Sequence, residues 1–312
     1  MTSPVVVALG GGHGLAASLT ALRLLTDQIT AVVTVADDGG SSGRLREEFG
    51  VLPPGDLRMA LAALCDDTEW GHQWRDVLQH RFAGEGPLGG HAVGNLLIVS
   101  LWDLLGDTVG GLDLVGRLLN ARGRVLPMAS VPLNIEANVM GADPVKPFEI
   151  STVVGQAEVA TTSGRVLSVR LNPREPPACD QAVEAIQAAD WVILGPGSWF
   201  TSVIPHLLVP GIHDALINTP AKRVLTLNLV MNTGETVGFS AENHLEVLAA
   251  HAPELRLDVV LADPGIVRDE ALLRRVAADM GAELVLASVG DHRRQGQHDS
   301  LRLAAAYRDM IR

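Results

Sequence analysis

The opening segment of the chain constrains the fold most, because it joins an apolar run, a glycine cluster and a helical pattern. Pro4–Leu9 is rich in β-branched residues, Gly10–Gly14 contains four glycines, and Leu15–Leu25 carries apolar residues at helical spacing. A second apolar run, Ile29–Ala36, completes a strand–helix–strand unit. Such a unit predicts two parallel strands joined by a right-handed crossover.

The same alternation returns after residue 180 and extends this prediction along the chain. We expect further strands at Trp191–Leu194, Arg223–Asn228, Val259–Ala262 and Leu284–Ala287, with helical patterns between them. The sequence thus predicts an α/β fold, a Rossmann-like parallel sheet with helices on both faces, plus a helical middle segment over residues 55–121. The length of 312 residues allows one large domain or two small ones, and we expect a single domain over residues 1–312.

The segment from residue 124 to residue 171 has a different pattern. It contains short strand-like runs that are separated by Gly and Pro, without long helices between them. We expect a small antiparallel, β-rich insertion here. Its predicted strands are Val125–Met128, Asn134–Met140, Phe148–Val154 and Val166–Leu171.

Charge and cysteine content exclude several classes of function. The net charge is −12 and no long Lys/Arg run is present, so we expect no nucleic-acid partner. Cys65 and Cys179 lie far apart without metal-type spacing, which argues against a disulfide framework or a Cys-based zinc site. No apolar stretch is long enough to span a bilayer, and no basic segment precedes the first apolar run. We therefore expect a cytoplasmic protein without membrane insertion.

Three glycine-rich turns follow predicted strands, and the first is Gly10–Gly14 (GGGHG), here called the first loop. Ligands of open parallel sheets bind beyond the carboxyl ends of the strands. Glycine lets the backbone approach a ligand, and the N–H groups of the following helix attract an anion. A close-packed turn would also explain the glycines, and Gly12-x-Gly14-x-x-Ala17 fits the dinucleotide pattern. Four glycines in five residues favour phosphate binding.

The second loop, residues 37–44, reads DDGGSSGR. A dinucleotide fold places one ribose-binding acid here, whereas this loop begins with two, Asp37 and Asp38. Two adjacent carboxylates can hold Mg²⁺ together with phosphate oxygens, and Ser41, Ser42 and Arg44 can contact the phosphate. A simple helix N-cap at one of the serines is the alternative, and both interpretations can hold at once.

The third loop, Gly195–Ser198 (GPGS), precedes hydroxyl-bearing residues and suits a second anion site, although Ser198 can also be a plain N-cap. Asn95 follows a glycine inside a helical pattern and either contacts a base or sugar or is a core amide. No histidine spacing typical of a metal site and no G-x-S-x-G motif is present, so no catalytic residue is named. The predicted ligand and phosphate contacts are Gly10, Gly11, Gly12, His13, Gly14, Gly39, Gly40, Ser41, Ser42, Arg44, Asn95, Gly195, Gly197 and Ser198, and the predicted metal ligands are Asp37 and Asp38.

Five motifs together resemble the YvcK-like gluconeogenesis factor family, the sister of the CofD-type 2-phospho-L-lactate transferases. The similarity extends to nearly the whole chain, and the second and third loops are its most specific parts. The motifs are, in order, GGGHG at Gly10–Gly14, DDGGSSGRLR at Asp37–Arg46, PPGDLR at Pro53–Arg58, GHAVGNLL at Gly90–Leu97 and GPGSWFTSVIPHLLVPGI at Gly195–Ile212.

This resemblance implies a cytoplasmic protein that is required for cell shape and wall synthesis on gluconeogenic carbon. It also implies binding of a nucleotide sugar, chiefly UDP-N-acetylglucosamine. The transferase cousins use Mg²⁺, and their metal aspartate matches Asp37 or Asp38. We therefore expect Mg²⁺ as the only cofactor, with no flavin or haem. Protein partners in wall-precursor synthesis and a homo-oligomer are compatible with the family.

The sequence departs from the family pattern at two positions. His13 stands where the first loop of relatives commonly has Thr, so an imidazole replaces a hydroxyl. Near the C-terminus relatives often carry Arg-His-Asp, whereas this chain reads Gln297-His298-Asp299. The second departure removes an arginine that is thought to contact the nucleotide sugar in relatives.

Three functional hypotheses remain at this point. The first is a nucleotide-sugar-binding regulator that is not itself an enzyme. The second is a Mg²⁺-dependent phospho- or nucleotidyl-transferase, whose chemistry needs positioning and charge neutralisation but no dedicated nucleophile. The third is an NAD-type oxidoreductase, which ranks last because no acid–base pair for hydride chemistry is evident.

Overall fold

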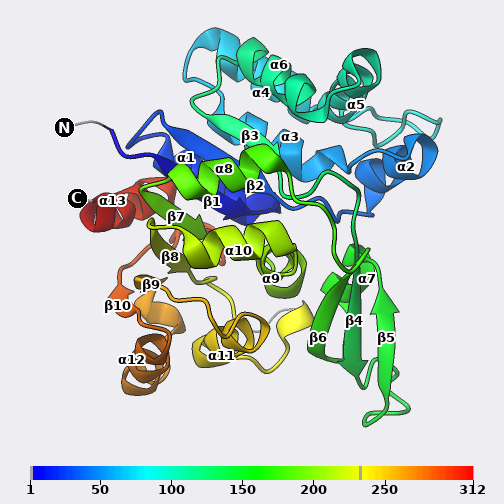
Figure 1. Cartoon of the computed structure of the whole chain (residues 1–312). Helices are drawn as coiled ribbons and strands as arrows, with labels where there is room; N and C mark the ends of the chain where they lie inside the picture. Colours follow the sequence, from blue (N-terminus) through cyan, green and yellow to red (C-terminus); the bar gives the residue numbers. More distant parts are fainter. Residues whose placement is uncertain (1–2, 232–233, 312) are drawn as a thin grey trace.

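The computed structural model describes residues 3–231 and 234–311, and its centre is a seven-stranded parallel sheet (Figure 1). The strand order is β10-β9-β8-β7-β1-β2-β3. This confirms the predicted α/β class. The strands are β1 (Val6–Gly10), β2 (Ile29–Val33), β3 (Arg124–Pro127), β7 (Trp191–Leu194), β8 (Lys222–Thr226), β9 (Val259–Ala262) and β10 (Glu283–Leu286).

The strand order reverses between β1 and β7. From β1 the chain continues outward to β2 and β3, whereas β7, β8, β9 and β10 are added on the opposite side of β1. β1 and β7 are paired in register from Val6 and Trp191 to Leu9 and Leu194. Both strands are buried along their whole length, as expected for a sheet covered on both faces. The first and third loops therefore leave the sheet side by side at its switch point.

Helices cover the sheet on both faces. In Figure 1, α8 and α10 cross one face of the sheet, whereas α1 packs with α3 and α13. The helices α4, α5 and α6 form a separate layer beside α3 at the top of the view. The helices are α1 (Gly12–Leu22), α2 (Gly40–Phe49), α3 (Pro54–Leu64), α4 (Glu69–Gln79), α5 (Val93–Leu105), α6 (Thr108–Leu118), α7 (Gln156–Thr161), α8 (Asp180–Ala188), α9 (Ile204–Leu207), α10 (Pro210–Asn218), α11 (Ala241–His251), α12 (Glu270–Asp279) and α13 (Ser300–Ile311).

A small antiparallel sheet extends from the body at the lower right of Figure 1. Its order is β5-β4-β6, with strands β4 (Asn134–Met140), β5 (Ile150–Val154) and β6 (Arg165–Asn172). Three of the four strands predicted for the insertion form this sheet. The fourth, near Val125, is instead β3, which pairs parallel to β2 because its apolar residues complete the edge of the large sheet. The small sheet thus begins about ten residues later than the predicted boundary at residue 124.

Within the described residues, no single helix has the length and apolar character needed to cross a bilayer. Only the two helical segments Trp199–Leu207 and Pro210–Asn218 reach that length and apolar character when taken together, and a bend of 74° separates them.

Candidate functional site

The first and third loops touch where the strand order reverses. Gly14 lies so close to the third loop that a Cβ placed on it would overlap the carbonyl group of Pro196 and stand 2.7 Å from the Cα of Gly197. Gly11, the N-cap of α1, is similarly enclosed, because a Cβ there would lie 2.5 Å from the carboxylate of Asp56. Gly11 and Gly14 are therefore required by the close approach of a carboxylate and of backbone.

Hydrogen bonds fix the third loop in this position. The side chain of Asn228, just beyond β8, accepts from the Gly197 N–H and donates to the Gly197 carbonyl, both at 2.8 Å. On the other side, the Ser18 hydroxyl of α1 donates to the Gly195 carbonyl at 3.1 Å. Tyr307 of α13 lies 2.9 Å from the Ser18 hydroxyl and 3.0 Å from that of Thr226, so strand, helix and loop are joined through one buried phenol.

A cavity of about 760 Å³ opens along these two loops, here called the ligand cavity. Its walls are the start of α1 from His13 to Thr20, the third loop, the segment after β8 and the chain between Gln295 and His298. A cavity of this volume at the carboxyl end of a parallel sheet is the usual location of a nucleotide-sized ligand. Ser198 is exposed in it and has no side-chain hydrogen bond among the described residues, so its hydroxyl is available to a ligand.

The second loop forms the start of α2, with Gly39 as N-cap and no side-chain cap. The uncapped backbone N–H groups of α2 suit an anion, as do those of α1. Asp37 accepts the Gly39 N–H at 3.0 Å and lies beside Gly55, on the side of the second loop that faces α3.

Asp56, in the first turn of α3, completes an acidic pair with Asp37. It lies against the first loop and accepts a hydrogen bond from the Gly12 N–H. Burial, and after it the charge of Asp37, raises the pKa of Asp56 to about 7. Asp56 is buried and subject to the negative charge of Asp37. A bound cation or a proton would therefore stabilise it.

Asp38 has a different environment from Asp37. Its two carboxylate oxygens accept the backbone N–H groups of Gln156 and Ala157, each at 3.0 Å, so it caps the start of α7. The predicted pair Asp37 and Asp38 is therefore split between two elements. The carboxylate that shares the neighbourhood of Asp37 is Asp56.

The hydroxyl groups of the second loop are engaged inside the protein. Ser41 lies 3.0 Å from His91 and accepts from the Asn95 amide at 3.0 Å, and Ser42 accepts the Gly55 N–H at 3.0 Å. Ser41, Ser42 and Asn95 are all buried, so their side chains stabilise the contact between α2, α3 and α5. Arg44 donates to the carbonyl groups of Pro87 and Gly89 and holds that segment against α2. The structure thus places these four predicted contacts outside the ligand cavity.

Sequence reasoning missed three features of the site. Asp56 is named above only as part of the PPGDLR motif, whereas in the structure it follows the N-cap Pro53 inside α3 and lies against the first loop. Asn228 lies just beyond the carboxyl end of β8, a position where a polar residue is a usable signal. Glu235 also lines the ligand cavity, but it lies in the short helical turn Gly234–Thr236 and not at the end of a predicted strand. Its position in the sequence therefore did not mark it as part of a site.

Glu235 is a buried carboxyl group at the edge of the ligand cavity. It accepts the Phe200 N–H at 3.0 Å, yet its second carboxylate oxygen has no partner among the described residues. Burial raises the pKa of Glu235 to about 7 from an ordinary value of 4.5. Glu235 is therefore poised to carry a proton near neutral pH.

This raised pKa predicts how stability depends on pH. Because the folded state keeps the Glu235 proton between pH 4.5 and about 7 while the unfolded state loses it, the free energy of unfolding falls as pH rises through that range. In the wild type, we expect Glu235 to lower the free energy of unfolding by on the order of 3 kcal/mol between pH 5 and pH 8. Glu235→Gln is expected to abolish this decrease. Urea unfolding at both pH values measures this difference, with Glu254→Gln on the surface as control. An unchanged pH profile in Glu235→Gln contradicts the prediction.

Comparisons with known proteins find relatives over nearly the whole chain. The family described as "2-phospho-L-lactate transferase CofD" matches residues 6–299. A protein of Mycobacterium tuberculosis named "Putative gluconeogenesis factor" is 55% identical over 96% of this chain and 88% of its own length. The "Gluconeogenesis factor" of Bacillus subtilis is 36% identical over 86% of this chain and 81% of its own. The crystal structure of a UPF0052 family member from Bacillus halodurans superposes with a TM-score of 0.86 at 31% identity, covering 98% of this chain and 99% of that one.

Proposed function

The chain belongs to the CofD family, and from this membership and the geometry of the ligand cavity we propose that it binds a nucleotide sugar of the UDP-N-acetylglucosamine type. The supporting observation is the cavity of about 760 Å³ between the first and third loops, with the first turn of α1 at its wall. Asp56 takes only the Gly12 N–H of this turn. Backbone N–H groups there suit a diphosphate, and the remaining volume accommodates a base and a sugar.

The proposed role is regulatory, and it takes as its guide the relatives named as gluconeogenesis factors. Binding of a wall precursor would report its supply and thereby couple wall synthesis and cell shape to carbon use. In this proposal the ligand packs against His13 and Ser198. These are the exposed polar side chains of the first and third loops, and both line the ligand cavity. We keep cytoplasmic location, protein partners in wall-precursor synthesis and a homo-oligomer as parts of this proposal.

A second candidate function is a Mg²⁺-dependent transferase of phosphate-containing groups, and the pair Asp37 and Asp56 favours it. Within the described residues, no three His, Cys, Asp or Glu side chains are grouped to hold a metal. Two carboxylates nevertheless fit Mg²⁺, which commonly takes its other ligands from water and substrate phosphate. When bound, the ion would neutralise charge on the transferred phosphate. The chain itself would position the phosphate with the N–H groups of α1 and α2.

A thermal-shift panel separates these functions. We expect UDP-N-acetylglucosamine at about 100 times its Kd to add about 2.7 kcal/mol to the free energy of unfolding, which raises the Tm by a few degrees. The regulator predicts this shift with or without Mg²⁺ and no product on incubation. The transferase predicts a shift that needs Mg²⁺ and a released phosphate-containing product. Stabilisation by NADH and not by UDP-sugars would contradict both proposals.

A further inference from the structure

A second cavity, of about 620 Å³, lies on the other side of the first turns of α1. Its walls come from α1, α3 and the segment from α4 to Arg81. Four of its lining residues are arginines and none is an aspartate or glutamate: Arg23, Arg58, Arg75 and Arg81. We call it the arginine cavity. In a chain with 24 basic and 36 acidic residues, such a local excess of positive charge is unexpected.

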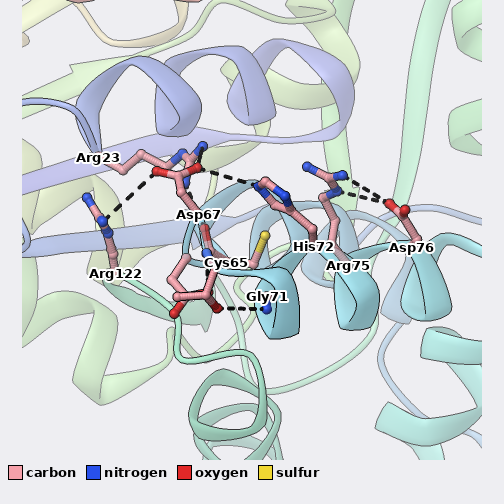
Figure 2. Close-up of polar contacts among 10 residues, drawn as sticks. Arg23, Cys65, Asp67, Gly71, His72, Arg75, Asp76 and Arg122 are labelled. Atoms are coloured by element: carbon pink, nitrogen blue, oxygen red, sulfur yellow. Dashed lines mark hydrogen bonds and ion pairs between the residues drawn. The ribbon is translucent and has the colours of Figure 1, made fainter.

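Two of these arginines, Arg23 and Arg75, have polar partners that Figure 2 shows. Arg23 donates to the Cys65 carbonyl at 2.8 Å and pairs with Asp67 at 2.7 Å. Arg75 pairs with Asp76 at 3.1 Å on the neighbouring position of α4. These contacts fix the guanidinium groups without placing a carboxylate among the lining residues.

The other two arginines have no ion pair among the described residues. Arg58 is only 4% exposed. Among the described residues, its one side-chain hydrogen bond is to the amide oxygen of Gln79. Its Nε is buried without a partner. Arg81 lines the same cavity, while the carboxylates of Asp56 and Asp37 act on Arg58 from outside the lining. A buried guanidinium beside a second positive charge costs free energy that an anion would offset.

We propose that the arginine cavity binds the phosphate group of a small molecule, as a site separate from the ligand cavity. Guanidinium groups present planar N–H pairs that match phosphate oxygens, and several of them around one cavity favour a doubly charged anion. His13 and Thr20 line both cavities, so the two sites adjoin across α1. The second ligand therefore lies beside the first loop, with His13 between the two.

Titration with inorganic phosphate at constant ionic strength, followed by calorimetry, tests this site. We expect saturable binding to the wild type and a Kd that is about tenfold higher in Arg81→Gln. Arg81 is exposed, and its guanidinium donates only to the Gly90 carbonyl, at 2.9 Å, among the described residues, so we expect its replacement to leave the fold intact. The control is Arg308→Gln, since Arg308 is also an exposed arginine but lines neither cavity.

Ser198→Ala, in the ligand cavity, distinguishes the two possible phosphate sites. Unchanged phosphate affinity in Ser198→Ala and Arg308→Gln, together with the loss in Arg81→Gln, supports the proposal. It is overturned by the absence of saturable binding to the wild type, or by an equal loss in Arg308→Gln. It is also overturned by a loss in Ser198→Ala without one in Arg81→Gln, because phosphate then binds at the glycine loops. None of these outcomes depends on whether the protein binds a nucleotide sugar.

Discussion

Asp56→Asn is expected to weaken Mg²⁺ binding at least about tenfold, because it removes one of the two carboxylates at the start of α2 and α3. Asp37 and Asp56 interact strongly enough for the charge of one to raise the pKa of the other. A divalent cation between them relieves that repulsion, whereas the asparagine amide offers a weaker, uncharged oxygen. Calorimetric titration with MgCl₂, in the presence of the nucleotide that gives the largest thermal shift, measures the effect.

Asp38→Asn is the matched control for that measurement. Its carboxylate caps α7 through Gln156 and Ala157, so we expect a loss of stability of about 1 kcal/mol and little change in Mg²⁺ affinity. The opposite result, with Mg²⁺ affinity lost in Asp38→Asn and kept in Asp56→Asn, would place the metal at Asp38 and contradict the assignment to Asp56. Unchanged affinity in both variants would contradict a metal site formed by Asp37 and Asp56.

The fold was largely predictable because its signals are local. Apolar runs identified β1, β2 and β7, and helical spacing over Leu15–Leu25 identified α1 within three residues of its observed bounds. The assignment of β3 failed for a physical reason. A four-residue apolar run at Arg124–Pro127 has the same pattern whether it joins a small antiparallel sheet or the edge of a large parallel one. Only the long-range pairing with β2 decides between them.

The site was predictable in part, since the loops follow from strand ends whereas the partners of their side chains do not. The sequence indicates that Gly14 and Pro196 belong to functional loops, and the structure brings these loops into contact. It cannot show that Ser41 binds Asn95, because that bond joins helices 54 residues apart in the chain. Adjacent acids look like a pair in a sequence, yet the backbone directs Asp38 towards α7 and Asp37 towards Asp56.

Like charges are gathered at two neighbouring places in the structure. Asp37 and Asp56 concentrate negative charge at the start of α2 and α3, while Arg58 and Arg81 concentrate positive charge at the arginine cavity. The charges of Asp56 and Asp37 also reach Arg58 and offset part of the repulsion there. Each like-charged pair costs stability in the free protein, and each cost falls when a ligand of opposite charge binds. An overall charge of −12 masks this local arrangement, so composition alone gives no indication of it.

Gly14→Ala is expected to destabilise the protein by roughly 3 kcal/mol and to abolish the thermal shift caused by the nucleotide ligand. Helix propensity alone predicts the reverse, since alanine in place of glycine inside a helix is favourable by about 1 kcal/mol. Sterics dominate, because the added Cβ would meet the backbone of Pro196 and Gly197. That backbone cannot yield easily, as Asn228 and Ser18 hold the third loop from both sides.

Gly86→Ala provides the control, because a Cβ at Gly86 meets no atom within 4 Å. We expect its free energy of unfolding to stay within about 0.5 kcal/mol of the wild type and its ligand response to be unchanged. Urea unfolding gives the stability of both variants, and the thermal shift with UDP-N-acetylglucosamine gives the response. If Gly14→Ala were as stable as Gly86→Ala and still bound the ligand, the first and third loops would not need to touch. The proposed nucleotide site, which depends on that contact, would then be wrong.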